Sequence, residues 1–253
     1  IKEADGKYIF KYDCRLGGVD LAVELAEYIE WVKADAKADK VELVASSYGS
    51  ALALSLLNEY SPTINANANV DTDILESIDS ILLCVPSAKG VDFASELFSG
   101  NIDVKPEALK AFLDDMLGDN EIALLLSTLI KTGTLGAILD KALLPFVHAA
   151  LMNAVRSVIL NVFGTMPSMW SFVDDEHFED ALINIYGEDY ANPDHEYAEL
   201  INRITYYHYN IQNKSTEILK AAEAADHEVN IICKYGDPSI PISTKGNILS
   251  DGF

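Results

Sequence analysis

Apolar and polar positions follow two different periods in the first third of the chain. Aromatic and polar side chains alternate over residues 7–12, which predicts a strand, and apolar side chains recur at helical spacing over 19–37. The same signals predict a strand over 40–45, a helix over 50–58 and an almost entirely apolar strand over 78–85. A strand this apolar is expected to be covered on both faces. Strands and helices that alternate in this way predict an α/β fold with a parallel sheet.

The pattern then becomes helical throughout residues 91–194, with no convincing strand. The centre of this stretch is apolar enough to make a transmembrane helix the main alternative. Charged side chains interrupt the apolar run, however, and Pro145 and Gly164 break it further, so that no apolar stretch of about 20 residues remains. We therefore expect an inserted helical cap and no stable membrane span.

The sheet pattern returns near the end of the chain. Helical periodicity covers residues 195–225, and a last strand is predicted over 228–235. The predicted organisation is an α/β core, made of residues 1–90 and 195–253, with the helical cap at 91–194 inserted between its two parts.

Composition narrows the possible functions. A chain of 253 residues is long enough for one large domain or for a domain with an inserted cap. Its net charge of −22 disfavours binding to nucleic acid and to anionic membrane surfaces. Three widely spaced cysteines indicate neither a disulfide framework nor a zinc site, and the acidic clusters lack the histidines or glycine turns of a metal site. We expect no cofactor and no metal.

The junction between the second predicted strand and the following helix carries the clearest candidate chemistry. It reads Ala45-Ser46-Ser47-Tyr48-Gly49, with small residues on both sides of a serine. A nucleophile elbow has this form, because a strained turn between a strand and a helix presents its serine at the carboxyl edge of the sheet. The usual signature is G-x-S-x-G, and here Ala45 replaces the first glycine. An ordinary serine N-cap is the structural alternative.

Four further segments occur in a matching order along the chain. Residues 12–16 read Y-D-C-R-L, residues 83–90 read L-C-V-P-S-A-K-G, residues 166–172 read M-P-S-M-W-S-F, and residues 250–252 read S-D-G. With the elbow, they resemble the Y-D-W-R-L, G-H-S-M-G-G, L-G-T-P-x-x-G, P-S-x-W and G/S-D-G motifs of the lecithin:cholesterol acyltransferase-like branch of the α/β-hydrolases. The departures from the family pattern are Cys14, Ala45 and Ser46.

The resemblance implies an α/β-hydrolase fold, in which helices flank a parallel sheet, and a set of site residues. Ser47 corresponds to the nucleophile, and the backbone N–H of Tyr48 to one oxyanion donor. Asp251 corresponds to the acid of the triad, with Asp237, after the last predicted strand, as the alternative acid. No histidine follows Asp251, although the base follows the acid in this family. We therefore expect the triad histidine, the second oxyanion donor and the outermost strands to lie outside this chain.

None of the histidines present is expected to be the base. His148 is interpreted as a cap histidine, His177 as part of a solvated acidic face, and the remaining three as helix or turn residues: His195, His208 and His227.

Other polar and aromatic groups receive structural interpretations. Asp13 and Arg15 are interpreted as an ion pair, the acidic run 174–176 as solvated surface, and Trp170 as part of the cap core.

The expected function is that of a serine hydrolase or acyltransferase acting on a small-molecule ester or lipid-like substrate. The alternative is a non-catalytic α/β-hydrolase-like protein that uses its cap for binding. Without the base, Ser47 stays protonated at neutral pH, so this segment alone is expected to be inactive.

Overall fold

The structure is a computed structural model that describes residues 6–69, 74–101, 153, 157 and 161–233. The chain divides into two compact units. The first unit contains Ile1–Gly90, Met166–Asp175 and Asp189–Cys233, and the second contains Val91–Thr165, Glu176–Glu188 and Lys234–Phe253. The core and cap boundaries inferred from the sequence stay a prediction.

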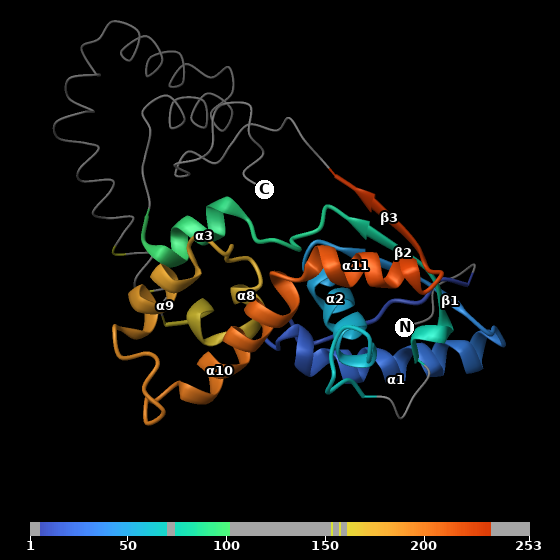
Figure 1. The fold of residues 1–253 in the computed structure, drawn as a ribbon, viewed down its shortest axis with the longest axis horizontal. Coiled ribbons are helices and arrows are strands. Elements are labelled where there is room, and N and C mark those ends of the chain that lie inside the picture. Colours follow the sequence, from blue (N-terminus) through green and yellow to red (C-terminus); the bar gives the residue numbers. More distant parts are fainter. Residues whose placement is uncertain (1–5, 70–73, 102–152, 154–156, 158–160, 234–253) are drawn as a thin grey trace, which may run out of the picture. The chain divides into compact units, whose positions relative to one another are not determined.

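A three-stranded parallel sheet forms the centre of the first unit (Figure 1). Its strands are β1 (Val41–Ser46), β2 (Ile78–Cys84) and β3 (Glu228–Ile232), in the order β1-β2-β3. Ser46 pairs with Cys84, and Cys84 with Ile232, so the three strands end at the same edge. This sheet, with its flanking helices, confirms the α/β class.

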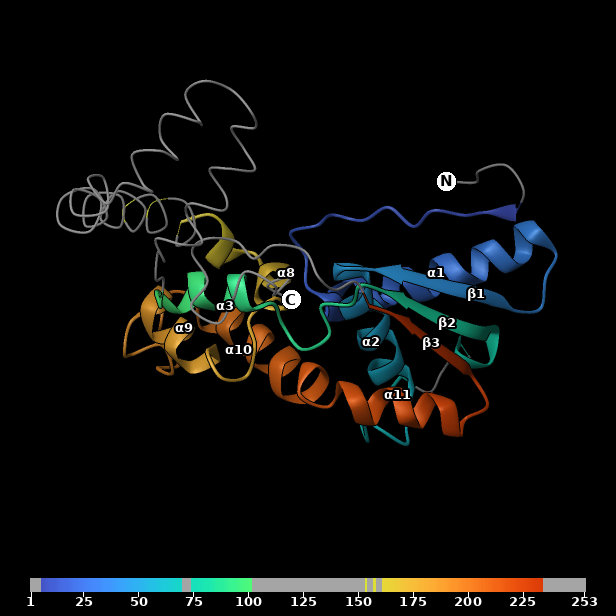
Figure 2. The same ribbon diagram turned by 90° about the horizontal axis from the view of Figure 1, so that it is seen from above.

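The two faces of the sheet differ in burial. Ile78, Ile81 and Leu83 of β2 are fully buried on one face, where α2 (Tyr48–Tyr60) and α11 (Ser215–Ala224) both lie (Figure 2). On the other face Val44 is 63% exposed and Ile232 54% exposed, and Leu82 and Cys84 are only half-buried. Within the described part of the chain, the prediction that β2 is covered on both faces is therefore wrong. An apolar run in the sequence indicates that a strand is buried, but it does not show whether one face or both faces of its sheet are covered.

Two helices pack on one another beside the sheet. In α1 (Gly18–Ala36) the buried side chains recur at helical spacing, as in Leu21, Leu25 and Ile29, and this face packs on α2. The two backbones come close at Gly18, where an added Cβ would collide with Ser55 Oγ. A glycine at this position therefore permits the close approach of the two helices.

The first predicted strand is not formed. Residues 7–12 run as an extended segment in which only Tyr8 makes a strand-like bridge. Their side chains pack on α1 instead: the Phe10 ring lies 5.2 Å from that of Tyr28, and the Tyr28 hydroxyl donates to the Ile9 carbonyl at 2.9 Å. The side chains do alternate along this segment, but a strand also needs a neighbouring backbone with which to pair.

The long helix predicted over 195–225 consists of three parts. These are α10 (Ala198–Tyr207), a π-helical turn η6 (His208–Gln212) and α11. A short helix, α8 (Pro167–Trp170), precedes them in the first unit, where the Ser168 hydroxyl donates to the Cys14 carbonyl. The buried Trp170 therefore belongs to the unit that contains the sheet.

The described elements of the second unit are helices, and hydrogen bonds from Asn184 and Tyr186 link them. Asn184 donates to the Phe98 carbonyl at 2.9 Å, and Tyr186 donates to the Gly164 carbonyl at 2.6 Å. The elements of this unit are α3 (Asp92–Ser99), η5 (Phe163–Thr165) and α9 (Phe178–Tyr186). None of the helices in the described part of the chain combines the length and apolar character that a membrane span requires.

Candidate active site

Ser47 lies in the turn between the end of β1 and the start of α2. Its backbone angles are φ 51° and ψ −120°, and its residue surface is exposed. Its N–H donates to the Cys84 carbonyl at 3.0 Å, which continues the β1–β2 ladder by one step. The strained turn predicted at the carboxyl edge of the sheet is therefore present. Such angles cost a residue with a Cβ about 1–3 kcal/mol.

Two buried serines hold the Ser47 turn in place. The Ser47 carbonyl accepts hydrogen bonds from the N–H of Ser50 at 2.9 Å, the hydroxyl of Ser50 at 2.6 Å and the hydroxyl of Ser87 at 3.3 Å. The Ser50 hydroxyl in turn accepts the N–H of Ser87 at 3.1 Å. Neither serine was predicted as part of the site. A serine three positions after the elbow was the available signal, because its hydroxyl can bond back to that carbonyl.

The small residues beside Ser47 are not sterically crowded in the turn. A methyl group added at Gly49 would lie 3.7 Å from the Cβ of Ala45, which is an ordinary van der Waals contact. Alanine in place of the first glycine of the signature is therefore compatible with this geometry.

Tyr48 has a backbone N–H beside Ser47 and a buried side chain that packs in the core. As the first residue of α2, it has an N–H without an acceptor inside the helix, and this group lies next to Ser47. Its hydroxyl donates to the Leu16 carbonyl at 2.7 Å, and its ring lies between those of Tyr12 and Phe172. Burial raises the pKa of the Tyr48 phenol, so that the side chain stays neutral.

The predicted acids, Asp251 and Asp237, lie outside the described residues, as does His148. His227 is described, and its Nδ1 lies 3.0 Å from the Ile78 carbonyl at the start of β2. Ser47 follows the opposite end of the sheet, so His227 is too distant to serve as its base.

Two other histidines occupy structural positions. His195 lies in a turn, where its Nδ1 accepts the N–H of Tyr197 at 3.1 Å. His177, in the second unit, is only 6% exposed, and its carbonyl accepts a hydrogen bond from Ala181. The prediction that His177 belongs to a solvated face is therefore wrong, because its acidic neighbours precede α9 while His177 is packed at the start of that helix.

His208 has both ring nitrogens engaged. This side chain is 1% exposed, with Nδ1 2.8 Å from Gln212 Oε1 and Nε2 3.0 Å from Asp175 Oδ1. Asn213 donates to the same Asp175 oxygen at 2.6 Å, and this bond is the main reason why the pKa of Asp175 lies below its usual range, with His208 adding to the effect. The Asp175 carboxylate thus orders a buried histidine, which the interpretation as plain solvated surface missed.

An ion pair precedes α1 at the predicted position. Arg15 Nη2 lies 2.5 Å from Asp13 Oδ2, and hydrogen bonds from Arg15 hold the pKa of Asp13 at about 2. This confirms the structural interpretation of the pair. Within the described residues, no group of three or more His, Cys, Asp or Glu side chains is arranged to hold a metal ion.

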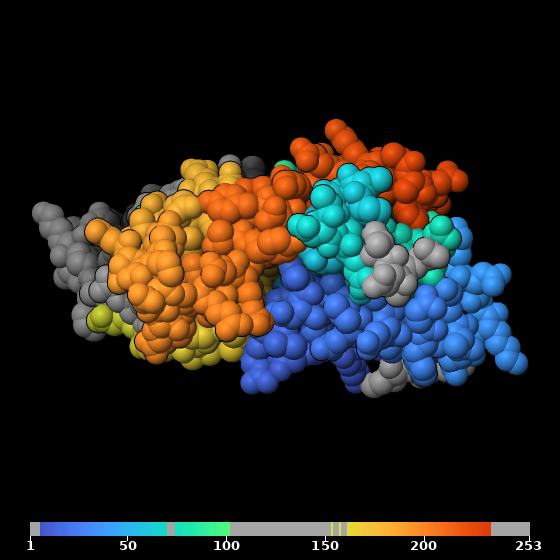
Figure 3. All heavy atoms as spheres, turned by 60° about the horizontal axis from the view of Figure 1, so that its bottom comes forward, coloured from blue at the N-terminus to red at the C-terminus, as the bar shows by residue number. Residues whose placement is uncertain are grey.

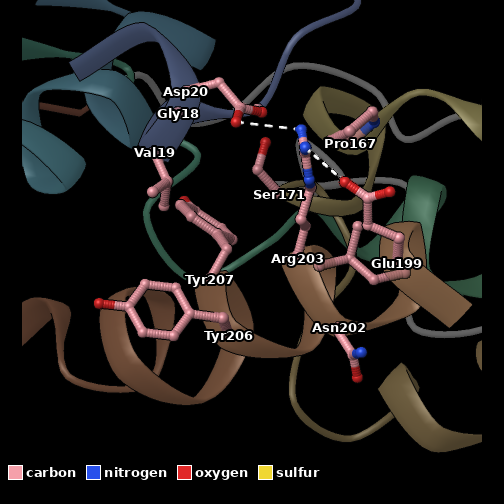
Figure 4. A pocket seen from close by; sticks show the side chains of 12 residues that line it. Gly18, Val19, Asp20, Pro167, Ser171, Glu199, Asn202, Arg203, Tyr206 and Tyr207 are labelled. Atoms are coloured by element: carbon pink, nitrogen blue, oxygen red, sulfur yellow. Dashed lines mark hydrogen bonds and ion pairs between the residues drawn. The ribbon is translucent and has the colours of Figure 1, made fainter. Parts of the chain in front are cut away.

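The first unit also contains a cavity of about 270 Å³ (Figure 4). The residues around it come from the start of α1, from α8 and the residue after it, and from α10. Ser47 is not one of them, so the cavity and the elbow are separate features.

The structure thus describes one part of the predicted catalytic site. Ser47 and the Tyr48 amide lie together at the carboxyl edge of the parallel sheet, and the Ser47 hydroxyl makes no hydrogen bond to a described residue. Comparisons with models of known protein families, with curated proteins and with solved structures find no match to this chain.

Proposed function

We propose that this protein is a serine ester hydrolase or acyltransferase in which Ser47 is the nucleophile. The observation that carries the proposal is the backbone of Ser47, with φ 51° and ψ −120°, between a parallel strand and a helix. Two buried serines hold this strained turn, and strain of this kind is concentrated at functional sites.

The chemistry follows from the position of the turn. The Ser47 oxygen attacks the ester carbonyl, and the Tyr48 N–H donates to the oxyanion that develops. The N-terminus of α2, a helix of 13 residues, adds partial positive charge at the same place. Expulsion of the alcohol leaves an acyl-enzyme, and water or a second alcohol then takes the acyl group.

A general base completes the mechanism. It takes the hydroxyl proton as Ser47 attacks and returns that proton to the departing alkoxide. By the family resemblance, we assign this role to a histidine that is oriented by Asp251 or, as the alternative, by Asp237. This mechanism needs no cofactor.

The proposed substrate class is an ester with an apolar or lipid-like acyl group. The cap sequence is strongly apolar at residues 122–130 and 135–163, most of which lie outside the described residues. The net charge of −22 disfavours strongly anionic substrates.

The second candidate function is non-catalytic binding. The cavity of about 270 Å³ that lies apart from Ser47 favours this alternative, because it offers a binding site without a nucleophile.

A fluorophosphonate probe distinguishes the two functions, because it reacts covalently with an activated serine. We expect the full-length protein to be labelled at Ser47, as mapped by peptide mass spectrometry, and Ser47→Ala to lose the label. Ser46→Ala is the matched control, since Ser46 is the exposed neighbour at the end of β1, and this variant is expected to keep the label. Absence of labelling in the folded full-length protein would favour non-catalytic binding.

A further inference from the structure

The cavity of about 270 Å³ in the first unit has a mostly apolar wall. Val19, Pro167 and Ile204 contribute aliphatic side chains to it, and Tyr206 and Tyr207 contribute aromatic ones. Only the ring of Tyr207 belongs to the wall, because its hydroxyl is fully buried. Figure 3 shows the α10 segment lying against the beginning of α1, the two elements that contribute most of the lining residues. Such a wall favours a ligand that is mostly hydrocarbon.

Three charged side chains of the described residues border the cavity, and their sum is negative. Arg203 donates to Asp20 at 3.2 Å and to Glu199 at 2.8 Å, so that one guanidinium serves two carboxylates (Figure 4). The excess negative charge acts together with the net charge of −22 of the whole chain. Both disfavour an anionic ligand and favour a cationic one.

Asp20 is the carboxylate that is better placed to meet a cation. Its Oδ1 accepts the bond from Arg203, whereas its Oδ2 makes no hydrogen bond to a described residue. A Cβ built on Gly17 would lie 3.4 Å from this Oδ2 and 3.1 Å from the Cβ of Pro167, so the oxygen borders the space that the glycine leaves open. The side chain of Asp20 is 33% exposed and that of Glu199 84% exposed, so solvent screens Asp20 less.

Hydrogen bonds from two buried side chains hold the cavity in shape. The Tyr48 hydroxyl donates to the carbonyl of Leu16, directly before the lining residue Gly17, at 2.7 Å. Gln212, in the π-helical turn, donates to the carbonyl of Ser171, another lining residue, at 2.9 Å. Turns of this kind are rare and occur frequently at functional sites. A cavity that is already ordered binds a ligand at a lower entropic cost than one that must first be ordered.

We propose that this cavity binds a small primary ammonium compound, with its hydrocarbon part against the apolar wall and an N–H that donates to Asp20 Oδ2. A cavity of about 150 Å³ holds benzene, so this one has room for roughly ten non-hydrogen atoms. An alkylamine is a cation at about pH 7, as the lysine side chain is. The proposal does not depend on catalysis at Ser47, because Ser47 does not line the cavity.

The test compares three probes that share a skeleton, by isothermal titration calorimetry on the 253-residue chain. Phenylpropylamine is the cation, propylbenzene is the neutral hydrocarbon and hydrocinnamate is the anion. We expect phenylpropylamine and propylbenzene to bind, and hydrocinnamate to bind more weakly than the amine, because the lining is net negative. The proposal is overturned if the amine does not bind, or if hydrocinnamate binds as tightly as the amine.

Asp20→Asn tests the contact with the ammonium group, because it removes the charge and keeps the shape of the side chain. We expect it to weaken phenylpropylamine binding roughly 5- to 10-fold, which corresponds to one charge-assisted hydrogen bond in a partly exposed site, and to leave propylbenzene binding unchanged. Glu24→Gln is the matched control, because it lies one turn further along α1 and changes the net charge equally. Equal weakening of amine binding by the two variants would show unspecific attraction to an acidic protein and overturn the proposal.

Two further measurements locate the site. Excess propylbenzene is expected to displace the amine, because both probes use the same wall, and Ser47→Ala is expected to bind the amine normally. Val19→Phe fills the cavity and is expected to abolish binding of both probes, with circular dichroism to check that the variant is folded. The proposal is overturned if propylbenzene does not compete, if Ser47→Ala loses amine binding, or if a folded Val19→Phe variant still binds the amine.

Discussion

Two residues at the carboxyl edge of the sheet hold backbone angles that side chains disfavour. Ser47 has φ 51°, and Val85, which follows β2, has φ 48°. Positive φ is unusual for any residue with a Cβ and most unusual for a β-branched one. The Val85 N–H donates to the Ile232 carbonyl at 2.7 Å, so the strain lies where neighbouring strands end. This concentration of strain at the edge that presents Ser47 fits a functional role for that edge.

The strain at Ser47 predicts an unusual order of stability among substitutions. Glycine adopts positive φ without a steric penalty, so Ser47→Gly is expected to be more stable than Ser47→Ala by about 1 kcal/mol. At Ser46, which is in extended β1 backbone, the order is expected to reverse, because glycine weakens a strand. Urea denaturation of the four variants provides the measurement. The same order at both positions would contradict the assignment of strain to Ser47.

The hydrogen bonds to the Asp175 carboxylate predict how the free energy of unfolding depends on pH. Hydrogen bonds from Asn213 and His208 lower the pKa of Asp175 below its ordinary value of 3.8, so the folded state favours the carboxylate. The resulting stabilisation is complete above about pH 3.8 and is lost as the pH falls through the lowered pKa. Asp175→Asn is therefore expected to flatten the acid limb of the free energy of unfolding, measured between pH 6 and pH 2.

The control for this titration is Glu24→Gln, a change on the exposed face of α1. Its acid limb is expected to follow that of the wild-type chain. If Asp175→Asn and Glu24→Gln flatten the limb equally, the bonds to Asn213 and His208 do not stabilise the fold.

At the scale of elements, the Ser50–Ser87 contacts connect α2 to the loop after β2. Ser87 N–H donates to Ser50 Oγ at 3.1 Å, while the Ser87 hydroxyl makes the longer bond of 3.3 Å to the Ser47 carbonyl. Both serines are buried, so water does not readily replace a lost partner. The geometry of the nucleophile turn therefore depends on two segments that are far apart in the sequence.

These contacts predict unequal effects for two similar substitutions. Ser50→Ala removes the acceptor of a buried N–H and is expected to lower the free energy of unfolding by about 1–3 kcal/mol. Ser87→Ala removes only the longer bond and is expected to lower it by about 0.5–1 kcal/mol. Chemical denaturation of both variants checks this order, and an equal or smaller loss for Ser50→Ala would count against it.

At the scale of the whole molecule, charge dominates the behaviour in solution. The net charge of −22 over 253 residues opposes compaction through self-repulsion. One face of the sheet also leaves apolar side chains accessible, among them Val44 and Ile232. Repulsion between molecules therefore helps to keep these surfaces apart.

Screening this charge is expected to raise thermal stability and to promote association. The Debye length falls from about 30 Å at 0.01 M salt to about 8 Å at 0.15 M, so most long-range repulsion is removed over this range. We expect the Tm to increase with sodium chloride while light scattering also increases. Val44→Thr is expected to keep the increase in Tm and to reduce the scattering. A Tm that falls with salt would show that attractive ion pairs outweigh repulsion.

The sequence by itself determined the elements whose signals are local. Periodicity located β1, β2 and α1 within one or two residues of their observed bounds, because spacing along the chain decides which side chains share a face. The strained Ser47 turn was also predictable, since small residues and serines between a strand and a helix favour it. The family resemblance and the roles of Asp251 and Asp237 stay predictions.

Only the tertiary structure shows which of these segments pair with another strand or pack against another layer. Residues 7–12 alternate like a strand but lack a ladder, and the apolar β2 is fully buried on one face only. Likewise, no local signal shows that Tyr207 meets the start of α1 or that its hydroxyl is left unpaired. Strand pairing, layering and hydrogen-bond satisfaction depend on groups distant in sequence, and folding brings these groups together.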